Sequence, residues 1–451
     1  MSKKILLISA NRFKVPYPVY PLGIAYIHTY LKKNLQDFDI RVFDMNLASP
    51  MELQEYIDDF QPGYIGISLR NADDVDSTSR ESFAGGYREL VEVSRKSGNA
   101  MIIIGGSAFS IFPELFFREL GPDYGIIGEG EESMYKLISG LEEGMDIKAI
   151  EGLVFNDGKG VRINPRKKYV RSLELNFDPD LLGYYWHHSG MLNIQTKRGC
   201  PFRCVYCTYP LIEGRHVRTL DPGQIVETLE RLRKESNIDY VFFTDSVFNI
   251  NNRFNRELAE LLIRKDLRIR WGAYFTITHL ERDFLALMKR AGLTHIEFGT
   301  EALSDITLKS YGKEFSAEEV IRASAWCNEL DIYFAHFLIL GGIGETEKSL
   351  SETFENSKRI NNSVFFPFVG MRIYPGTPLH ESAIKEGLMS REEELLEPRY
   401  YIAPGVHLED LKGRAAQTGR RWVFPDEDHE KVMEKMRKKN KKGPLWEYLI
   451  R

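Results

Sequence analysis

Short apolar runs alternate with amphipathic segments through the first 145 residues, and this alternation restricts the fold more than any other feature. The runs begin at residues 4, 39, 64, 100 and 124, and helical periodicity is clear at 23–35. Strands buried on both faces read as continuous apolar runs, and parallel strands need helical crossovers between them. Residues 1–145 are therefore predicted to form an α/β domain with a flavodoxin-like (Rossmann-type), doubly wound sheet.

Four loops follow the expected strands, at 9–21, 68–74, 105–109 and 128–133. In an open α/β sheet, ligands bind beyond the carboxyl ends of the strands. Glycine in several of these loops would let the backbone approach a flat, bulky ligand closely, although in any single loop glycine can simply end a strand. No G-x-G-x-x-G follows the first run, which argues against a dinucleotide ligand.

A second alternating series covers residues 191–385. Before it, residues 146–190 form a connector with a predicted hairpin turn at Asp157–Gly160. The series has six βα-like units, too few for an eight-unit closed barrel, and so predicts a partial (β/α)6 barrel. A mainly helical C-terminal extension is expected over 386–451. The expected strands are 192–199, 240–246, 270–276, 295–302, 333–342 and 368–376, and the expected helices are 222–235, 255–264, 283–291, 316–329 and 347–360.

The composition is that of a globular protein, with 451 residues, 43% hydrophobic residues and a net charge of −5. This charge gives no general attraction to nucleic acid or to an anionic membrane. There is no apolar run of the roughly 18 residues that a membrane span needs, and the run ending at Asn11 is too short for a signal peptide. We expect a cytoplasmic protein without nucleic acid as a partner. The basic run 436–443 reads as a solvated helix face, with docking of an acidic partner as the alternative.

Three of the four cysteines lie close together, at Cys200, Cys204 and Cys207, with the spacing C-x3-C-x2-C. So few cysteines in a long chain do not form a disulfide framework. Grouped thiolates suit a soft metal, but structural zinc usually takes four ligands. The fourth cysteine, Cys327, reads as a buried apolar residue inside a helix. Iron–sulfur cubes are normally held by four thiolates, so three would leave one iron open; a zinc knuckle is the alternative.

The motif resembles the signature of the radical S-adenosylmethionine (SAM) enzymes, C-x3-C-x-aromatic-C, with Tyr206 at the aromatic position. The resemblance covers about residues 192–376. It implies a [4Fe-4S] cluster bound by Cys200, Cys204 and Cys207, with SAM on the open iron.

The same resemblance implies a SAM site at the strand ends of the barrel. The segment 242–252 takes the place where the family often has Gly-Gly-Glu for the methionyl amine, although the glycines are absent. The segment 298–303 resembles the ribose site, where a carboxylate would accept hydroxyl hydrogen bonds; an exposed glutamate at a helix start is the alternative. The segment 337–346 resembles the glycine motif beside the adenine. The implied SAM-binding residues are Tyr206, Asp245, Ser246, Glu301, Gly341 and Gly342.

A flavodoxin-like domain directly before a radical SAM barrel resembles the layout of the cobalamin (B12)-dependent radical SAM enzymes. The segments 20–27, 105–109 and 125–133 look like that family's cobalamin-binding segments. The D-x-H-x-x-G motif that supplies a lower histidine ligand in other cobalamin proteins is absent. The residues implied to bind cobalamin are Tyr20, Ser68, Leu69, Arg70, Asn71, Gly105, Gly106, Ser107, Gly128, Glu129, Gly130 and Glu131.

Arg70 is the residue expected beneath the cobalt. Similar enzymes of the tryptophan 2-C-methyltransferase type carry an arginine here that approaches the metal without ligating it. A cation at this place would resist withdrawal of electrons from the cobalt. An exposed arginine paired with Asp73 or Asp74 is the alternative. In the C-terminal extension, Tyr400 and Tyr401 are candidates for lining a substrate pocket, or are packing aromatics.

The resemblance implies a cobalamin-dependent radical SAM methyltransferase that uses a [4Fe-4S] cluster, SAM and cobalamin (methylcobalamin). The methyl group would pass from SAM, by way of methylcobalamin, to an unactivated carbon. The acceptor stays open: a protein or peptide residue such as a glutamine of methyl-coenzyme M reductase, an amino acid such as tryptophan, or a natural-product or lipid precursor. An electron donor such as ferredoxin or flavodoxin is implied.

Two alternatives remain from the sequence: a non-methylating rearrangement or cyclisation enzyme, and a cobalamin or iron–sulfur sensor without turnover. Formation of a 5′-deoxyadenosyl radical also stays open, and no catalytic residue is assigned.

Overall fold

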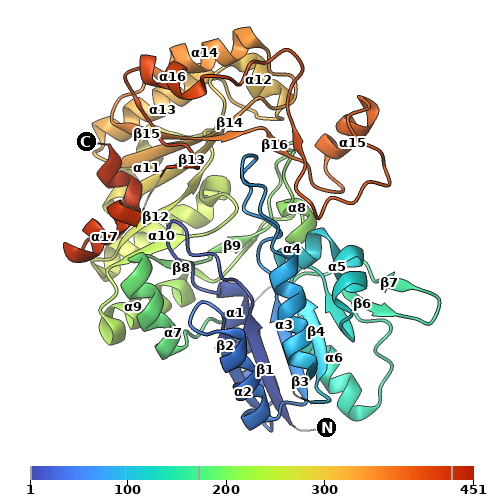
Figure 1. Ribbon diagram of the computed structural model, residues 1–451. Coiled ribbons are helices and arrows are strands. Elements are labelled where there is room, and N and C mark those ends of the chain that lie inside the picture. The colour runs from blue at the N-terminus through green and yellow to red at the C-terminus, as the bar shows by residue number, and fades with distance from the viewer. Residues whose placement is uncertain (1–2, 97, 171–172, 428–429, 451) are drawn as a thin grey trace.

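The computed structural model describes residues 3–96, 98–170, 173–427 and 430–450. It contains two large sheets, one from each half of the chain (Figure 1). The first sheet lies below the barrel in this view, and helices cover the outside of both.

The first sheet has the strand order expected for a flavodoxin-like domain. Its parallel strands follow the order β2-β1-β3-β4-β5, which confirms the doubly wound prediction. The strands are β1 (Lys4–Ser9), β2 (Asp39–Asp44), β3 (Tyr64–Ser68), β4 (Met101–Gly105) and β5 (Tyr124–Ile126).

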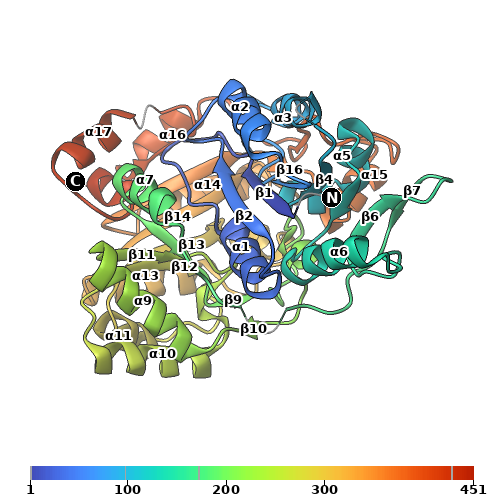
Figure 2. The same cartoon turned by 90° about the horizontal axis from the view of Figure 1, so that it is seen from below.

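Helices cover both faces of this sheet (Figure 2). Successive side chains of a strand point to opposite faces. Accordingly Ile5 and Leu7 pack with one group of helices, whereas Leu6 and Ile8 pack with the other. The first group is α1 (Leu22–Asn34) and α6 (Glu131–Glu143); the second is α2 (Pro50–Phe60), α3 (Ala84–Lys96), α4 (Ser107–Ile111) and α5 (Pro113–Leu120).

The hairpin predicted in the connector extends the first sheet. Strands β6 (Leu153–Asn156) and β7 (Val161–Ile163) are antiparallel, and the Asp157 N–H donates to the Gly160 carbonyl across the turn at 3.1 Å. Because β6 pairs with β5, part of the expected connector belongs to the first sheet. The rest leads into α7 (Pro179–Ser189), whose Tyr185 hydroxyl donates to Asp44 at 2.6 Å.

The second sheet is the partial barrel. Six parallel strands run in sequence order, and one short strand from the C-terminal extension, β18 (Arg421–Trp422), pairs at the far edge. The six strands are β8 (Leu192–Ile194), β11 (Tyr240–Phe243), β12 (Arg270–Phe275), β13 (Leu293–Glu301), β14 (Tyr333–Leu340) and β15 (Ser363–Val369).

The sixth strand was misplaced by the sequence prediction, which put it at 368–376. Strand β15 instead contains Pro367, a residue that argues against a central strand because it has no N–H to donate. The structure tolerates this proline because β18 pairs only with Val364 and Phe365, so the ladder on that side ends before Pro367.

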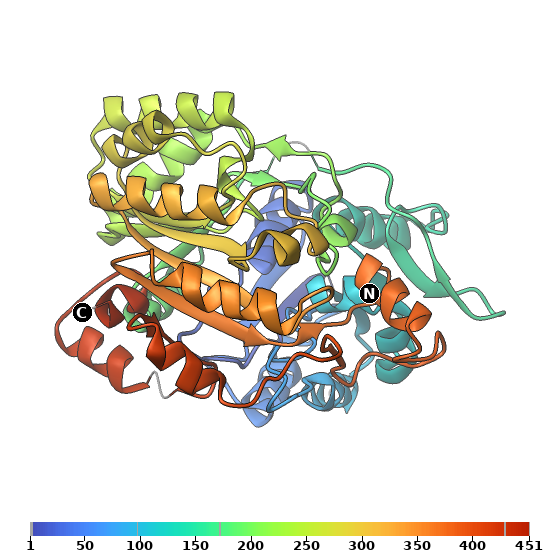
Figure 3. The same cartoon turned by 90° about the horizontal axis from the view of Figure 1, so that it is seen from above.

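Helices between the strands cover the outer surface of the barrel (Figures 2 and 3). Five of them lie where the sequence predicted helices, whereas α12 was not predicted. Side-chain caps fix several of the starts: Asp221 accepts from the Gln224 N–H, and Ser316 forms a capping box with Glu319. The helices are α9 (Pro222–Ser236), α10 (Asn252–Lys265), α11 (Arg282–Arg290), α12 (Asp305–Ser310), α13 (Ala317–Glu329) and α14 (Glu347–Ser357).

Shorter elements complete the chain. Around the cysteine motif lie β9 (Lys197–Arg198), α8 (Tyr209–Ile212), β10 (Arg218–Thr219) and η1 (Phe248–Ile250); the C-terminal part holds β16 (Met371–Arg372), α15 (Pro378–Lys385), β17 (Tyr400–Tyr401), α16 (Leu411–Gln417), α17 (Glu430–Lys438) and η2 (Leu445–Leu449). Tyr400 and Tyr401 pair with β16. The Tyr401 hydroxyl donates to Glu386 at 2.6 Å, which favours packing for this residue, whereas the buried Tyr400 hydroxyl has no partner in the described ranges. None of the helices in the described ranges has the length and apolar content needed to span a bilayer.

A buried ion pair joins the two halves of the chain. Arg372 donates to Asp73 of the first domain at 2.8 and 2.9 Å, and both side chains are almost completely buried. Arg372 also donates to the carbonyls of Ile373 and Leu395. Because these carbonyls pair two more of the five guanidinium hydrogens, the pair approaches the condition under which a buried charge is tolerated.

We expect the substitution Asp73→Asn to lower the free energy of unfolding by about 3–5 kcal/mol, because it leaves the Arg372 guanidinium buried without its counter-charge. Urea denaturation of the apoprotein measures this loss. The double variant D73N/R372M, which removes both charges, should be more stable than D73N alone. A single variant as stable as the wild type would contradict the burial of this pair.

Candidate active site

A cavity of about 370 Å³ lies between the two sheets. The carboxyl ends of β1, β3 and β4 line it on one side, and β8, β11, β12 and β13 of the barrel line it on the other. Tyr17 from the loop after β1 and Tyr209 of α8 also border it. The cavity therefore occupies the position where an open α/β sheet binds its ligand, with the barrel interior as the opposite wall.

Most of the residues expected to bind cobalamin line this cavity. Leu69 and Asn71 do not border it, and a contact of Asn71 with cobalamin remains a prediction. Side chains after β3 continue to alternate in direction, so Ser68 and Arg70 face the cavity while Leu69 is fully buried in the core. The lining residues of the expected set are Tyr20, Ser68, Arg70, Gly105, Gly106, Ser107, Gly128, Glu129, Gly130 and Glu131.

Gly106 shows why a glycine is required at this edge. Its φ is +98°, and a Cβ built on it would lie 2.4 Å from the Leu69 carbonyl oxygen. Any side chain here would force the loops after β3 and β4 apart. The two loops are also joined by hydrogen bonds, including one from the Ala108 N–H to the Leu69 carbonyl at 3.0 Å.

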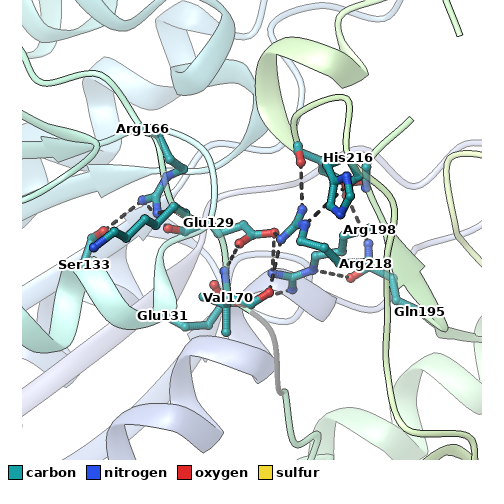
Figure 4. Close-up of polar contacts among 12 residues, drawn as sticks. Glu129, Glu131, Ser133, Arg166, Val170, Gln195, Arg198, His216 and Arg218 are labelled. Atoms are coloured by element: carbon teal, nitrogen blue, oxygen red, sulfur yellow. Dashed lines mark hydrogen bonds and ion pairs between the residues drawn. The ribbon is translucent and has the colours of Figure 1, made fainter. Parts of the chain in front are cut away.

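Glu129 and Glu131 take part in a buried ion-pair cluster with the barrel domain (Figure 4). Arg198, directly before the cysteine motif, pairs with Glu131 at 2.8 Å, and Arg218 pairs with Glu129 at 2.5 Å. Both carboxylates are only 3% exposed. Although burial alone would lower the pKa of Arg198, the two carboxylates raise it above its usual value. We call Glu129, Glu131, Arg198 and Arg218 the interdomain cluster.

The interdomain cluster corrects part of the cobalamin expectation. Both oxygens of the Glu129 carboxylate have partners in the protein, because Oε2 accepts from the Val170 N–H at 2.7 Å. Glu129 therefore joins the two domains although it borders the cavity. In contrast, the buried Oε2 of Glu131 has no hydrogen-bond partner in the described chain.

The residues of the cavity fit a corrin. A corrin ring carries primary amide side chains, which are N–H donors, and the Glu131 Oε2 is an acceptor without a partner at the cavity wall. Gly105, Gly106, Gly128 and Gly130 keep the wall free of side chains. Both features suit a wide, flat ligand with amide groups along its edge.

Arg70 is exposed and borders the cavity. The alternative that it pairs with Asp73 is wrong, because Asp73 pairs with Arg372. Asp74 does not pair with it either, since this carboxylate accepts from the Ser79 hydroxyl and the Asp76 N–H. Its position beneath the cobalt remains a prediction.

The cysteine loop is held in place by backbone contacts. Gly199 has φ +90°, and a Cβ on it would lie 2.2 Å from the His216 carbonyl oxygen, so only glycine allows the turn into Cys200. The Cys200 N–H donates to the Gly214 carbonyl at 3.1 Å. The Cys207 N–H donates to the Cys204 carbonyl at 3.3 Å, which closes a turn between the last two cysteines.

The environment of the thiols suits coordination better than free thiol chemistry. Burial raises the pKa of Cys200, and it raises that of Cys207 to about 12, so without a metal these groups stay protonated. Metal binding displaces such protons. Within the described residues, no three His, Cys, Asp or Glu side chains converge on a single-ion site; in an iron–sulfur cube each thiolate binds a different iron.

Cys327 is excluded as a fourth ligand by its position. It lies on α13, is completely buried and belongs to the main hydrophobic core. The prediction of a buried apolar residue is confirmed.

Tyr206, Glu301 and Lys313 form a network beside the cysteine loop. The Tyr206 hydroxyl donates to Glu301 Oε1 at 2.7 Å, and Lys313 Nζ lies 3.2 Å from the same oxygen. The register between β13 and β14 shifts between Gly299 and Glu301, and Glu301 has φ +66°, a bulge that redirects its side chain. Sequence reasoning missed Lys313, which follows α12 without a motif of its own. In the described ranges Glu301 Oε2 has no hydrogen-bond donor as a partner, so it is available to accept from a ribose hydroxyl.

Asp245 does not have the predicted role at the methionyl amine. It is completely buried, and it accepts from the Lys197 ammonium at 2.8 Å and from the Thr196 N–H at 2.6 Å. Asp245 thus fixes the strand that leads into the cysteine motif. The hydroxyl of its neighbour Ser246 donates to the carbonyl of Gly199, next to Cys200, at 3.3 Å. Ser246 therefore remains the candidate for SAM binding at this strand.

Gly341 and Gly342 end β14 in a tightly packed turn. Gly341 has φ +81°, and its N–H donates to the Glu345 carboxyl. A Cβ on Gly342 would lie 2.3 Å from the Tyr311 hydroxyl. Gly341 is thus required by its backbone conformation and Gly342 by the packing of the Tyr311 side chain, and their contact with adenine remains a prediction.

Glu297 is a cavity residue that the sequence reasoning missed. It lies on β13, two residues after His295, where alternating polar residues in an apolar strand mark the face toward the barrel interior. The Trp446 indole N–H donates to its Oε1 at 2.9 Å. Burial raises the pKa of Glu297 to about 7.

Comparisons with known proteins agree with both halves of this site. Residues 194–356 match the Radical SAM superfamily, and residues 8–138 match the B12 binding domain family. Together the two matches cover more than half of the chain.

Two curated relatives and one solved structure extend over most of the chain. An uncharacterized methyltransferase of Pyrococcus horikoshii is 26% identical over 82% of this chain and 79% of its own length. The tryptophan 2-C-methyltransferase of Streptomyces laurentii is 22% identical over 85% of this chain and 74% of its own. The methyltransferase TsrM of Kitasatospora setae, solved with cobalamin and a [4Fe-4S] cluster, has a TM-score of 0.90 at 20% identity, over 100% of this chain and 98% of that one.

The matched B12-binding segment contains the glycine-lined side of the cavity, and the matched radical SAM segment contains the cysteine loop. The [4Fe-4S] cluster, SAM and cobalamin are accordingly the cofactors of this protein. The chain belongs to the cobalamin-dependent radical SAM enzymes.

Proposed function

We propose that this chain is a cobalamin-dependent radical SAM methyltransferase that methylates a carbon atom of an acceptor in the interdomain cavity. The observation that carries the proposal is the composition of that cavity. One wall is the glycine-rich edge of the B12-binding sheet, and the other is the barrel interior, reached directly from the cysteine loop through Tyr209. When bound, the cluster and cobalamin supply the electron and the methyl carrier for this chemistry.

The protein's own residues bind and orient these groups. Cys200, Cys204 and Cys207 would hold the cluster, Ser246 and Glu301 would contact SAM, and the loops after β3, β4 and β5 would hold the corrin. The interdomain cluster joins the two walls, because Arg198 lies two residues before Cys200 and pairs with Glu131 of the opposite wall.

The acceptor class, an electron donor such as ferredoxin or flavodoxin, and a cytoplasmic location are parts of the same proposal. The curated relative from Streptomyces laurentii is named for tryptophan, and tryptophan is also bound in a structure of TsrM. Tryptophan and short glutamine peptides are therefore the first acceptors to test.

We expect the substitution Cys204→Ala to remove most of the iron from anaerobically purified protein, because a cube held by two thiolates is not retained. The wild type should contain about four irons per chain. The matched control is Cys327→Ala, which removes a thiol from the core and should leave the iron content unchanged. Zinc in place of iron in the wild type, or loss of iron from the Cys327 variant, would contradict the assignment.

We expect the reconstituted wild type to transfer a deuterated methyl group from labelled SAM to carbon in an acceptor, under reducing, oxygen-free conditions with cobalamin. Mass spectrometry of tryptophan, glutamine peptides and cell extract detects the label, and S-adenosylhomocysteine is measured in parallel. Protein with full cluster and cobalamin occupancy that forms no labelled acceptor, no S-adenosylhomocysteine and no 5′-deoxyadenosine would instead be a sensor.

A further inference from the structure

We infer that Glu297 recognises the methyl acceptor, and that the acceptor presents to it a nitrogen group with N–H donors, such as an ammonium, guanidinium, amide or indole. The inference rests on the proposed function, because it identifies the acceptor class for the same cavity.

The first support is the position of the carboxylate. Glu297 borders the cavity but is only 5% exposed. The Trp446 indole N–H donates to Oε1 of Glu297. In the described part of the chain, Glu297 forms no ion pair with a lysine, arginine or histidine. A buried carboxylate that lacks a counter-charge is unfavourable until a donor approaches it. The open space beside Glu297 is the cavity, so a ligand bound there can supply the missing donor.

The second support is the aromatic surround. Tyr274 is the register partner of Glu297 on the neighbouring strand, and the ring of Phe242 lies 5.0 Å from that of Tyr274 in an edge-on arrangement. Tyr17 closes the same part of the cavity from the first domain. Aromatic faces beside a carboxylate attract cationic nitrogen and polarised N–H groups. A phosphate or phosphonate at this place would be repelled by the Glu297 carboxylate.

The third support is Trp446, which contacts the Glu297 carboxylate from the side away from the cavity. Trp446 does not border the cavity and belongs to η2 of the C-terminal extension. Its indole N–H fixes one carboxylate oxygen and lowers the pKa of Glu297 against the larger effect of burial. Trp446 is therefore a positioning residue that acts through Glu297. The other ionisable groups that interact with Glu297 are Tyr17, Tyr240 and Tyr274, which burial keeps neutral; Arg70 borders the same cavity.

The test compares probes that differ in one group. Equilibrium dialysis of the anaerobic holoenzyme measures the Kd of 3-phenylpropylamine, tryptamine and L-glutaminamide, against 3-phenylpropanol, 3-phenylpropionate and 2-hydroxyethylphosphonate. We expect the amine to bind more tightly than the matched alcohol by at least about tenfold, and Glu297→Gln, which keeps the shape and still accepts from Trp446, to abolish that preference. Iron and cobalamin content of the variant control for folding.

Three results would overturn the inference: equal binding of amine and alcohol by the wild type, an unchanged preference in E297Q, or no binding of any nitrogen probe. Failure of the proposed function is a separate outcome. A Glu297-dependent preference for nitrogen probes without methyl transfer to any acceptor would refute the methyltransferase and leave this inference standing. Methyl transfer to an acceptor without N–H groups would support the methyltransferase and refute this inference.

The role of Trp446 has its own readout. The substitution Trp446→Phe keeps an aromatic ring but removes the donor, so the pKa of Glu297 should rise and the pH at which 3-phenylpropylamine binding is half-maximal should move upward. Binding needs the carboxylate charged, so affinity should increase with pH through that midpoint. A purely structural effect of W446F would weaken binding at every pH without moving the midpoint, and would contradict the positioning role.

Discussion

The ion pairs between the two domains determine where the site lies. Arg198 and Arg218 of the barrel reach two carboxylates of the B12-binding domain, and Arg372 reaches Asp73 at a second place. Removing charges from water is unfavourable, and buried pairs contribute little net stability when compared with apolar packing. These pairs instead orient the two domains. The charges of the arginines are compensated when the carboxyl ends of the first sheet face the barrel interior.

The chemistry of the cavity follows from this arrangement. Arg198 belongs to the strand that enters the cysteine motif, and Lys197 beside it is anchored on Asp245. The same short segment therefore ties the cluster loop both to its own barrel and to the opposite domain. Glycines on one wall leave space for a flat ring, whereas the other wall presents Glu297 and aromatic side chains. A carrier and an acceptor can thus meet in one space, which Arg198 and Tyr209 border from either side of the cysteine loop.

The sequence predicted correctly those features that depend on residues close together in the chain. The spacing of Cys200, Cys204 and Cys207, the five apolar runs and the glycine loops depend on neighbouring residues, and all were recognised. Long-range partners carry no such pattern. Glu129 and Asp245 were predicted to bind ligands. Residues near them in the sequence give no sign that they form ion pairs with Arg218 and Lys197. Glu297 and Trp446 are 149 positions apart and meet only after the C-terminal segment folds back onto the barrel.

The central claim is that the cysteine loop and the B12-binding loops serve one shared site. Electron paramagnetic resonance of the anaerobic protein tests it most directly, with the cluster reduced and bound cobalamin in its paramagnetic Co(II) state. The account predicts that the two signals are magnetically coupled, and that Cys204→Ala leaves an uncoupled Co(II) signal. Two independent signals in the fully loaded wild type would contradict it.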